Sequence, residues 1–140
     1  MDDGVYVGNA GADGAHNQGW LLGHFMPPDG LLHSSDVEVK WAVHARGERR
    51  AAWATGEVRT ALLVLIRGIF HIELRDRTVV LRDPGDYIVW GRGEDHSWHA
   101  LVAGTTVLTV RWPSLPGWRL PPAGESADPP VAGGVGPVVN

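Results

Sequence analysis

The chain has 140 residues, the length of a single domain, and its 44% apolar content against 20% charged residues excludes disorder throughout. Twelve basic and 16 acidic residues give a net charge of −4, which argues against binding to nucleic-acid phosphates. The absence of cysteine excludes disulfides, thiolate metal ligands and thiol nucleophiles.

The two ends of the chain differ in composition from its middle. Residues 1–19 and 113–140 are rich in Gly, Ala and Pro. Such segments bury too little apolar surface to offset an ordering entropy of roughly 1 to 2 kcal/mol per residue. The sequence therefore predicts a flexible N-terminal segment over 1–19, a folded domain over 20–112 and an irregular tail over 113–140.

No basic segment followed by an apolar run opens the sequence, and no stretch approaches 18 apolar residues. We therefore expect neither a signal peptide nor a membrane span, and a cytoplasmic location.

In the middle of the chain, short apolar runs are separated by turn residues every 8 to 12 positions, which indicates an all-β domain. After a short strand over 21–25, residues 36–44 alternate strictly, which predicts a half-buried strand. Its apolar face carries Val37, Val39, Trp41 and Val43, and its other face carries Glu38, Lys40 and His44. Residues 61–66 are all apolar, which predicts a strand covered on both faces.

The remaining elements continue the all-β pattern. Residues 49–53 are compatible with a turn of helix, and residues 70–74 form the return arm of a hairpin. Further strands are predicted over 79–81, 87–90, 97–102 and 105–112, which gives about eight in total. A short antiparallel set of this size avoids exposed edges by closing into a small barrel or a double-sheet jelly roll.

Residues 85–96 resemble the second motif of the cupin family, which is Gly, five residues, Pro-x-Gly, two residues and His. Gly85, Gly93 and His96 match it, whereas Gly91 stands at the Pro position and Ala100 at the position of a final Asn. This resemblance implies an RmlC-like double-stranded β-helix, or jelly-roll barrel. It also implies that His96 faces the barrel interior at a metal-ligand position.

The first cupin motif is present only as a degenerate frame, with Gly47 near its start and Gly68 at its end. Counting back from Gly68, the family's Glu falls at about Ala61, and its His-x-His pair falls within residues 53–56, Trp-Ala-Thr-Gly. One imidazole does not hold a first-row metal, which needs three or four donors. We therefore expect no cofactor.

A binding site without metal is predicted from strand phase. If His96 faces inward, Trp98 lies on the same side, and a neighbouring strand presents Glu57, Arg59 and Arg67 in one phase. An inward Arg59 requires a partner, either Glu57 or a ligand carboxylate or phosphate; an outward Arg59 is an ordinary strand-end cation. Trp53 is a further candidate ligand wall, against the simpler interpretation of a packed core residue.

Three hypotheses follow for function. The first is a barrel that binds a small organic molecule, either as a binding module or as a cofactor-free isomerase or cyclase with His96 as the acid or base. Glu94 and Asp95 would orient the His96 ring or raise its pKa, but the simpler interpretation, which we favour, is two acids in an exposed turn. The second is a dioxygenase or isomerase whose divalent metal is held by His96 with other donors, first His44 and Glu57, then His71 and His99. The third is a non-catalytic homodimer whose partner surface uses Trp20, Phe25 and Trp118.

Overall fold

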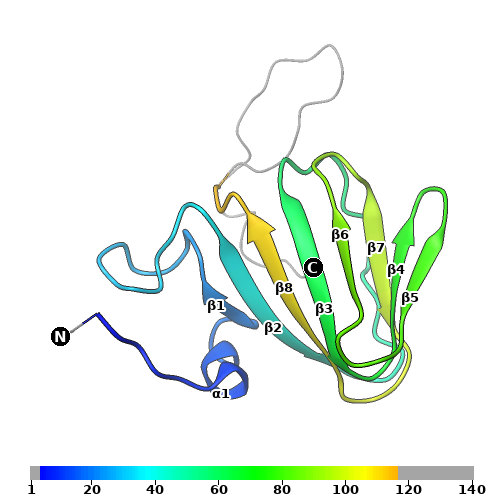
Figure 1. Ribbon diagram of the computed structural model, residues 1–140, viewed down its shortest axis with the longest axis horizontal. Coiled ribbons are helices and arrows are strands. Elements are labelled where there is room, and N and C mark those ends of the chain that lie inside the picture. The colour runs from blue at the N-terminus through cyan, green and yellow to red at the C-terminus, as the bar shows by residue number, and fades with distance from the viewer. Residues whose placement is uncertain (1–3, 117–140) are drawn as a thin grey trace, which may run out of the picture.

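A computed structural model describes residues 4–116, which form one short helix and eight strands (Figure 1). The elements are α1 (Ala10–Gly14), β1 (Trp20–Leu22), β2 (Glu38–His44), β3 (Thr60–Arg67), β4 (Phe70–Leu74), β5 (Thr78–Leu81), β6 (Tyr87–Trp90), β7 (His96–Ala100) and β8 (Thr105–Trp112). The all-β class and the eight predicted strands are confirmed. The helix α1 lies in the N-terminal segment that the composition predicted to be irregular.

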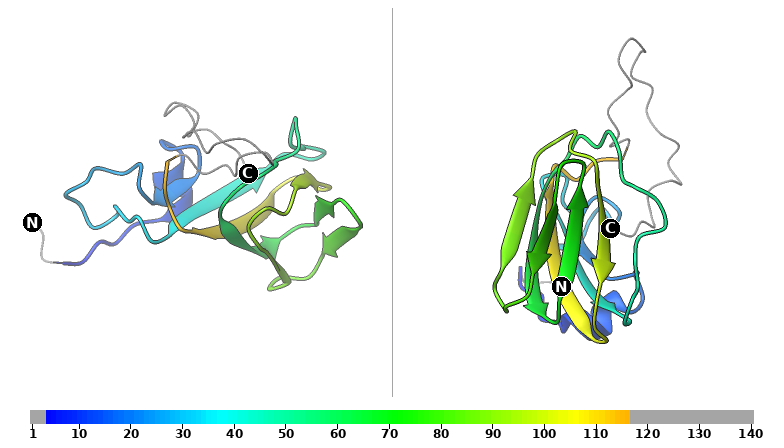
Figure 2. Two further views of the ribbon diagram at one scale, coloured as in Figure 1. Left: turned by 90° about the horizontal axis from the view of Figure 1, so that it is seen from above. Right: turned by 90° about the vertical axis from the view of Figure 1, so that its right-hand side faces the viewer.

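The strands form two antiparallel sheets that face each other. The larger sheet has the order β1-β2-β8-β3-β6, and the smaller one has the order β5-β4-β7. The chain passes from one sheet to the other between β3 and β4, β5 and β6, β6 and β7, and β7 and β8, as in a jelly roll. The right-hand view of Figure 2 shows the strands standing around a common interior. The described N-terminal segment lies beside β1, at the end of the molecule farthest from β4 and β5 (Figure 1).

Residues 49–54 extend the smaller sheet beyond β7, and the turn of helix predicted there is wrong. Arg49 forms an isolated antiparallel bridge with His99, and Ala54 forms one with His96. The backbone N–H of Ala54 donates to the carbonyl of His96 at 2.8 Å, and the reverse bond measures 3.0 Å. Pairing with β7 satisfies backbone groups that a single helical turn would leave without partners.

The apolar half of the interior is built mainly by β3 and β4. Leu63 and Leu65 from one strand pack with Phe70 and Ile72 from the other, and all four are fully buried. The alternate side chains of β3 are only half-buried, and Ile66 is exposed. The prediction that both faces of this strand are covered is therefore wrong: its second face lies on the outside of the larger sheet.

The buried face of β2 is the opposite of the predicted one. Glu38, Lys40 and His44 are buried, whereas Val43 is exposed. A period of two fixes which residues share a face, but it does not fix which face turns inward. The polar face turns inward here because β8 and the stretch before β3, in the same sheet, supply charged partners.

Those partners converge on the carboxylate of Glu38, which is completely buried. Arg59 and Arg111 both donate to its Oε2, the latter at 2.6 Å, and the Ser114 hydroxyl donates to its Oε1 at 2.8 Å. The backbone N–H of His24 donates to the Ser114 hydroxyl at 2.9 Å. These residues come from separate segments of the chain. The Glu38 carboxylate therefore links β2 to the stretch before β3, to the end of β8 and, through Ser114, to the backbone at His24.

The turn from β3 to β4 requires a glycine. Gly68 has a φ of +97°, and a Cβ there would collide with Thr105 at the start of β8. Gly68, which closes the first motif frame, is therefore required at this turn for steric reasons.

We expect Glu38→Gln to lower the free energy of unfolding by about 3 to 5 kcal/mol, because it leaves two buried guanidinium groups without their shared counter-ion. Urea unfolding followed by tryptophan fluorescence measures the change. The matched control is Glu94→Gln at an exposed position, with an expected change within about 0.5 kcal/mol. Equal effects of the two substitutions would contradict the central place of this carboxylate.

Candidate functional site

His96 lies inside the barrel at the start of β7, where only 3% of its surface is exposed. Its ring packs against the indole of Trp90 with centroids 4.5 Å apart. Its Nδ1 lies 3.4 Å from the carbonyl oxygen of Glu94. The imidazole is therefore held by a core tryptophan on one side and by its own turn on the other.

Burial lowers the pKa of His96, while the carboxylate of Glu57 and the Glu94 carbonyl act in the opposite direction and Arg50 and Arg111 add to the lowering. The ring is therefore neutral at pH 7. The carboxylates of Glu94 and Asp95 are not among the groups that act on this pKa, and Glu94 is exposed, in agreement with the interpretation of acids in an exposed turn. The carboxylate of Asp95 instead faces outward and pairs with Arg75 at 3.2 Å.

Trp98 follows two residues later on the same face of β7 and is 2% exposed. Its ring lies 4.5 Å from that of His44 and stacks on Phe70 at 5.5 Å. The indole Nε1 is buried and has no hydrogen-bond partner among residues 4–116. A buried N–H without an acceptor is rare in folded proteins and is a reason to look for a ligand.

Glu57 and Arg59 are both buried on the stretch that leads into β3. The guanidinium of Arg59 donates to Glu57 at 3.3 Å and also to Glu38. The pairing of Arg59 with Glu57 agrees with the prediction from strand phase. The second partner, Glu38, was not predicted. From Glu57 to Leu65, this inner face changes from charged to apolar.

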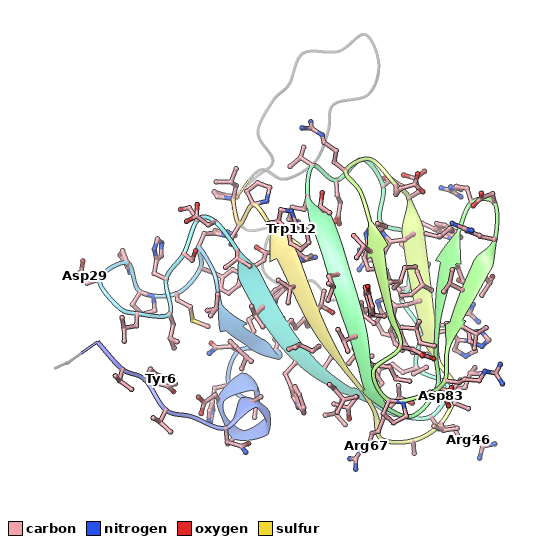
Figure 3. The ribbon with its side chains drawn as sticks, viewed as in Figure 1. Tyr6, Asp29, Arg46, Arg67, Asp83 and Trp112 are labelled. Carbon is pink, nitrogen blue, oxygen red and sulfur yellow. The ribbon has the colours of Figure 1, made fainter. Side chains whose placement is uncertain are left out.

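Two predicted ligand-binding residues lie elsewhere. Arg67 is exposed at the lower end of the larger sheet, where its Nε donates to the Gly104 carbonyl at 3.2 Å (Figure 3). The register of β3 with β8 shifts between Leu65 and Arg67, so the inward phase ends before it. Trp53 adjoins the inward Ala54 and takes the opposite face, where its ring lies 4.2 Å from the exposed guanidinium of Arg75.

Sequence reasoning missed three cationic residues of this site, Lys40, Arg50 and Arg111. Lys40 and Arg111 are buried, and they lie 5.3 Å and 4.6 Å from the centroid of the Trp20 ring. Burial, with the nearby charges of Arg111 and Arg50, lowers the pKa of Lys40 to about 7. The available signal was the alternation that places Lys40 on the same face as Glu38 in β2 and Arg111 on the same face as Thr109 in β8.

The residues of the site do not fit a metal centre. Within residues 4–116, no three His, Asp or Glu side chains gather closely enough to hold an ion. His96 lies against Trp90, whereas His44 lies against Trp98 and makes a 3.2 Å contact with Glu48. His71 and His99 face each other across β4 and β7, in the phase opposite to that of Phe70 and Trp98. The set of His96, His44 and Glu57 is therefore not brought together.

A separate groove of about 460 Å³ lies between the N-terminal segment and β1. Its polar wall includes Tyr6 and Asp13, which share a 2.6 Å hydrogen bond, and its apolar wall includes Leu22 and Met26. None of the site residues predicted from the sequence lines it. Trp20 contributes to this wall and is buried, so it is not available for the partner surface predicted for it; Phe25 is exposed, and Trp118 lies outside the described residues.

Comparison with solved structures identifies the fold. KdgF from Halomonas sp. is 23% identical, with a TM-score of 0.53 over 58% of this chain and 72% of that one. The chain has a cupin-like fold. An RmlC-like cupin from Shewanella frigidimarina also matches, at 15% identity and a TM-score of 0.49 over 58% of this chain and 68% of that one. A cupin-2 domain protein from the same organism matches at 17% and 0.45, over 56% and 71%.

In sequence, no family model matches and no curated protein is found to be related. In the described part of this cupin-like chain, no helix has the length and apolar character that crossing a bilayer requires.

We expect the free energy of unfolding to rise with pH between pH 7 and 9 in the wild type more steeply than in Lys40→Met. The folded chain releases the Lys40 proton near pH 7, whereas the unfolded chain keeps it to about pH 10.4. The unfolded state therefore holds more protons in this range, and the slope from this group is at most about 1.4 kcal/mol per pH unit. Guanidinium unfolding at pH 7, 8 and 9 measures it, and parallel curves for the two proteins would refute the low pKa.

Proposed function

We propose that the barrel interior binds a small organic acid without a metal centre. The observation that carries this proposal is the sign of the charges on the inner wall. Among residues 4–116, three arginines and Lys40 lie near the carboxylates of Glu38 and Glu57, and Lys40 is partly protonated at pH 7 because its pKa is about 7. The arginines are Arg50, Arg59 and Arg111. A carboxylate ligand would be attracted to this cationic wall and would offer a further acceptor to the buried guanidinium of Arg111.

Hydrogen-bonding capacity supports the same ligand class. Trp98 Nε1 and Arg111 Nε are buried donors without an acceptor in the described chain. Burial and the neighbouring Arg59 lower the pKa of Arg111 only to about 10, so its guanidinium is charged at pH 7. An oxygen-rich anion offers acceptors to both donors, whereas a hydrocarbon or a cation offers none.

His96 gives the site a group that moves protons. A neutral imidazole accepts a proton from a carbon next to a carboxylate or carbonyl, and the electron pair left behind passes to the oxygen, where arginine charges stabilise it. In an acid with a C=C bond next to that carbon, the electron pair extends over the C=C bond, and the imidazolium returns the proton to the far carbon of that bond. The double bond shifts by one position, and the isomerisation consumes no oxidant, reductant or cofactor. The fields of Arg50 and Arg111 reach His96, which places it near the cations that would hold the acid.

Binding is tested by calorimetric titration with a panel of small mono- and dicarboxylates and with their uncharged amides. We expect one equivalent of an acid to bind and its amide not to bind. Trp98→Phe, which removes the indole donor, weakens binding by about tenfold, the worth of one hydrogen bond of roughly 1.4 kcal/mol. The matched control is Trp53→Phe, which leaves binding unchanged. Absence of any acid that binds, or equal effects of the two substitutions, would overturn the proposal.

Catalysis is tested separately by NMR in D₂O with the acid that binds best. We expect the wild type to exchange carbon-bound hydrogen next to the carboxylate for deuterium, because His96 takes and returns that proton. His96→Gln should bind the acid and lose the exchange by at least about a hundredfold, the usual contribution of a general base. Binding without exchange in the wild type would leave a binding module, and exchange that persists in His96→Gln would remove this residue as the base.

A further inference from the structure

Lys40 is the one lysine of the chain, and it lies at a buried position. Of the twelve basic residues only Lys40 is lysine, and it is 6% exposed on the inner face of β2. A position that needs only a positive charge is served by arginine, which does not lose its proton in proteins. Lysine differs because burial favours its neutral amine, and a neutral amine is a nucleophile. The buried lysine is therefore a candidate for chemistry at the amine.

The Lys40 side chain is held between a glycine and an indole. Its Nζ lies 5.3 Å from the centroid of the Trp20 ring. Its stem packs over Gly19, where a Cβ would lie 3.2 Å from the lysine Cγ and 3.3 Å from its Cε. The amine therefore has a defined place at the inner face of β2, next to β1.

The charges that act on Lys40 come from segments packed against β2. Burial lowers its pKa, Arg111 of β8 and Arg50 of the segment beside β7 add to this effect, and Glu48 acts in the opposite direction. The resulting pKa is about 7. A substantial fraction of the molecules therefore carries the neutral, nucleophilic amine at pH 7.

Arg111 provides a place for a carboxylate beside this amine. Its guanidinium lies 4.6 Å from the centroid of the same Trp20 ring, and its Nε is a buried donor without an acceptor in residues 4–116. Among the charges that act on Lys40, that of Arg111 has the largest effect. In an α-oxo acid the carbonyl carbon is bonded directly to the carboxylate. An α-oxo acid held by Arg111 would therefore bring its carbonyl carbon close to Lys40 Nζ.

The groove between the N-terminal segment and β1 reaches the same indole. Trp20 contributes to the wall of this groove, whose volume is about 460 Å³. Pockets of this order hold small organic ligands. The Lys40 amine therefore lies one ring away from a space that admits a small acid.

We propose that Lys40 captures an α-oxo acid as an imine at its Nζ. The inference rests on the proposed function, because the cationic wall must hold the carboxylate, and it narrows the ligand to acids that carry a carbonyl next to that carboxylate. No other amine of the described chain can take this role, because the chain has no second lysine.

The reaction is balanced without a cofactor. The neutral amine adds its electron pair to the carbonyl carbon, the electron pair of the C=O bond moves to the oxygen, and one proton passes from nitrogen to that oxygen. The nitrogen pair then forms the C=N bond as the C–O bond breaks, and the oxygen leaves as water with the second proton of the nitrogen. One amine and one oxo acid thus give one imine and one water, with no oxidant or reductant consumed.

Reductive trapping of the full chain tests the proposal. Sodium cyanoborohydride at pH 7 in the presence of pyruvate converts such an imine into a stable secondary amine, which mass spectrometry detects as one added carboxyethyl group. Peptide mapping should place this group on Lys40, because the N-terminal amine is the only other primary amine. Folded Lys40 should react at least about tenfold faster than in urea, where the amine keeps its proton up to about pH 10.4. Lactate, which has the carboxylate but no carbonyl, should slow the trapping by competition.

The matched control is Lys40→Arg, which keeps a positive charge against Trp20 and removes the nucleophile. It should show the wild-type circular dichroism spectrum, bind lactate in calorimetry and lose trapping at this position. Acetone, which has the carbonyl but no carboxylate, should be trapped at least about tenfold more slowly than pyruvate, the worth of one hydrogen bond to a charged group.

Two results would overturn the proposal: trapping at the N-terminal amine alone, or equal rates at Lys40 in the folded and the unfolded chain. Either result in a protein that binds lactate would leave the proposed acid site standing without the imine. Failure of every acid in the calorimetric panel to bind would instead overturn the proposed function itself.

Discussion

The structure depends on the carboxylate of Glu38. It is fully buried, it accepts from Arg59, Arg111 and Ser114, and through Ser114 it holds the backbone at His24. A buried carboxylate is tolerated when three donors hydrogen-bond to it, whereas a buried guanidinium group without a carboxylate partner costs several kcal/mol of stability. The polar face of β2 therefore points into the barrel because of its ion pairs and not because of its hydrophobicity. Once Glu38 faces inward, Lys40 and His44 must follow, because alternate residues of a strand share a face.

The reversal on β2 has two consequences on opposite sides of the same sheet. Inside, among the residues that the structure describes, it leaves more cationic than acidic side chains around His96 and Trp98, which supports a small acid as the proposed ligand. Outside, it leaves Val39 and Trp41 in register with Val110 and Leu108 of β8, and Val43 opposite Thr106.

Much of the fold could be predicted from the sequence, because strands are encoded locally. Alternation over 70–74, the turn residues between 81 and 87, and the motif Gly85 to His96 each mark their element, and all eight strands are present. The facing of β2 could not be predicted. It is decided by Arg59 and Arg111, which lie 21 and 73 residues away from Glu38 in sequence and meet it only in the folded sheets. Trp53 and Arg67 were misplaced for a related reason: a bridge to β7 and a shift of register near Leu65 set their faces, and neither has a signature in composition.

Replacement of a metal by fixed cations would change what the site can do. A metal needs converging lone pairs, and the chain has Ala61 and residues 53–56 where the cupin pattern has carboxylate and imidazole donors. Arginine and lysine need the reverse, acceptors around a positive charge, and Glu38 and Glu57 supply part of that requirement for Arg59 and Arg111. Such a site would attract an acid electrostatically, but it would not activate water or oxygen, because a guanidinium has no coordination position to offer. Proton transfer by a neutral histidine remains available to it, and for that reason His96 is the group on which the proposed isomerisation depends.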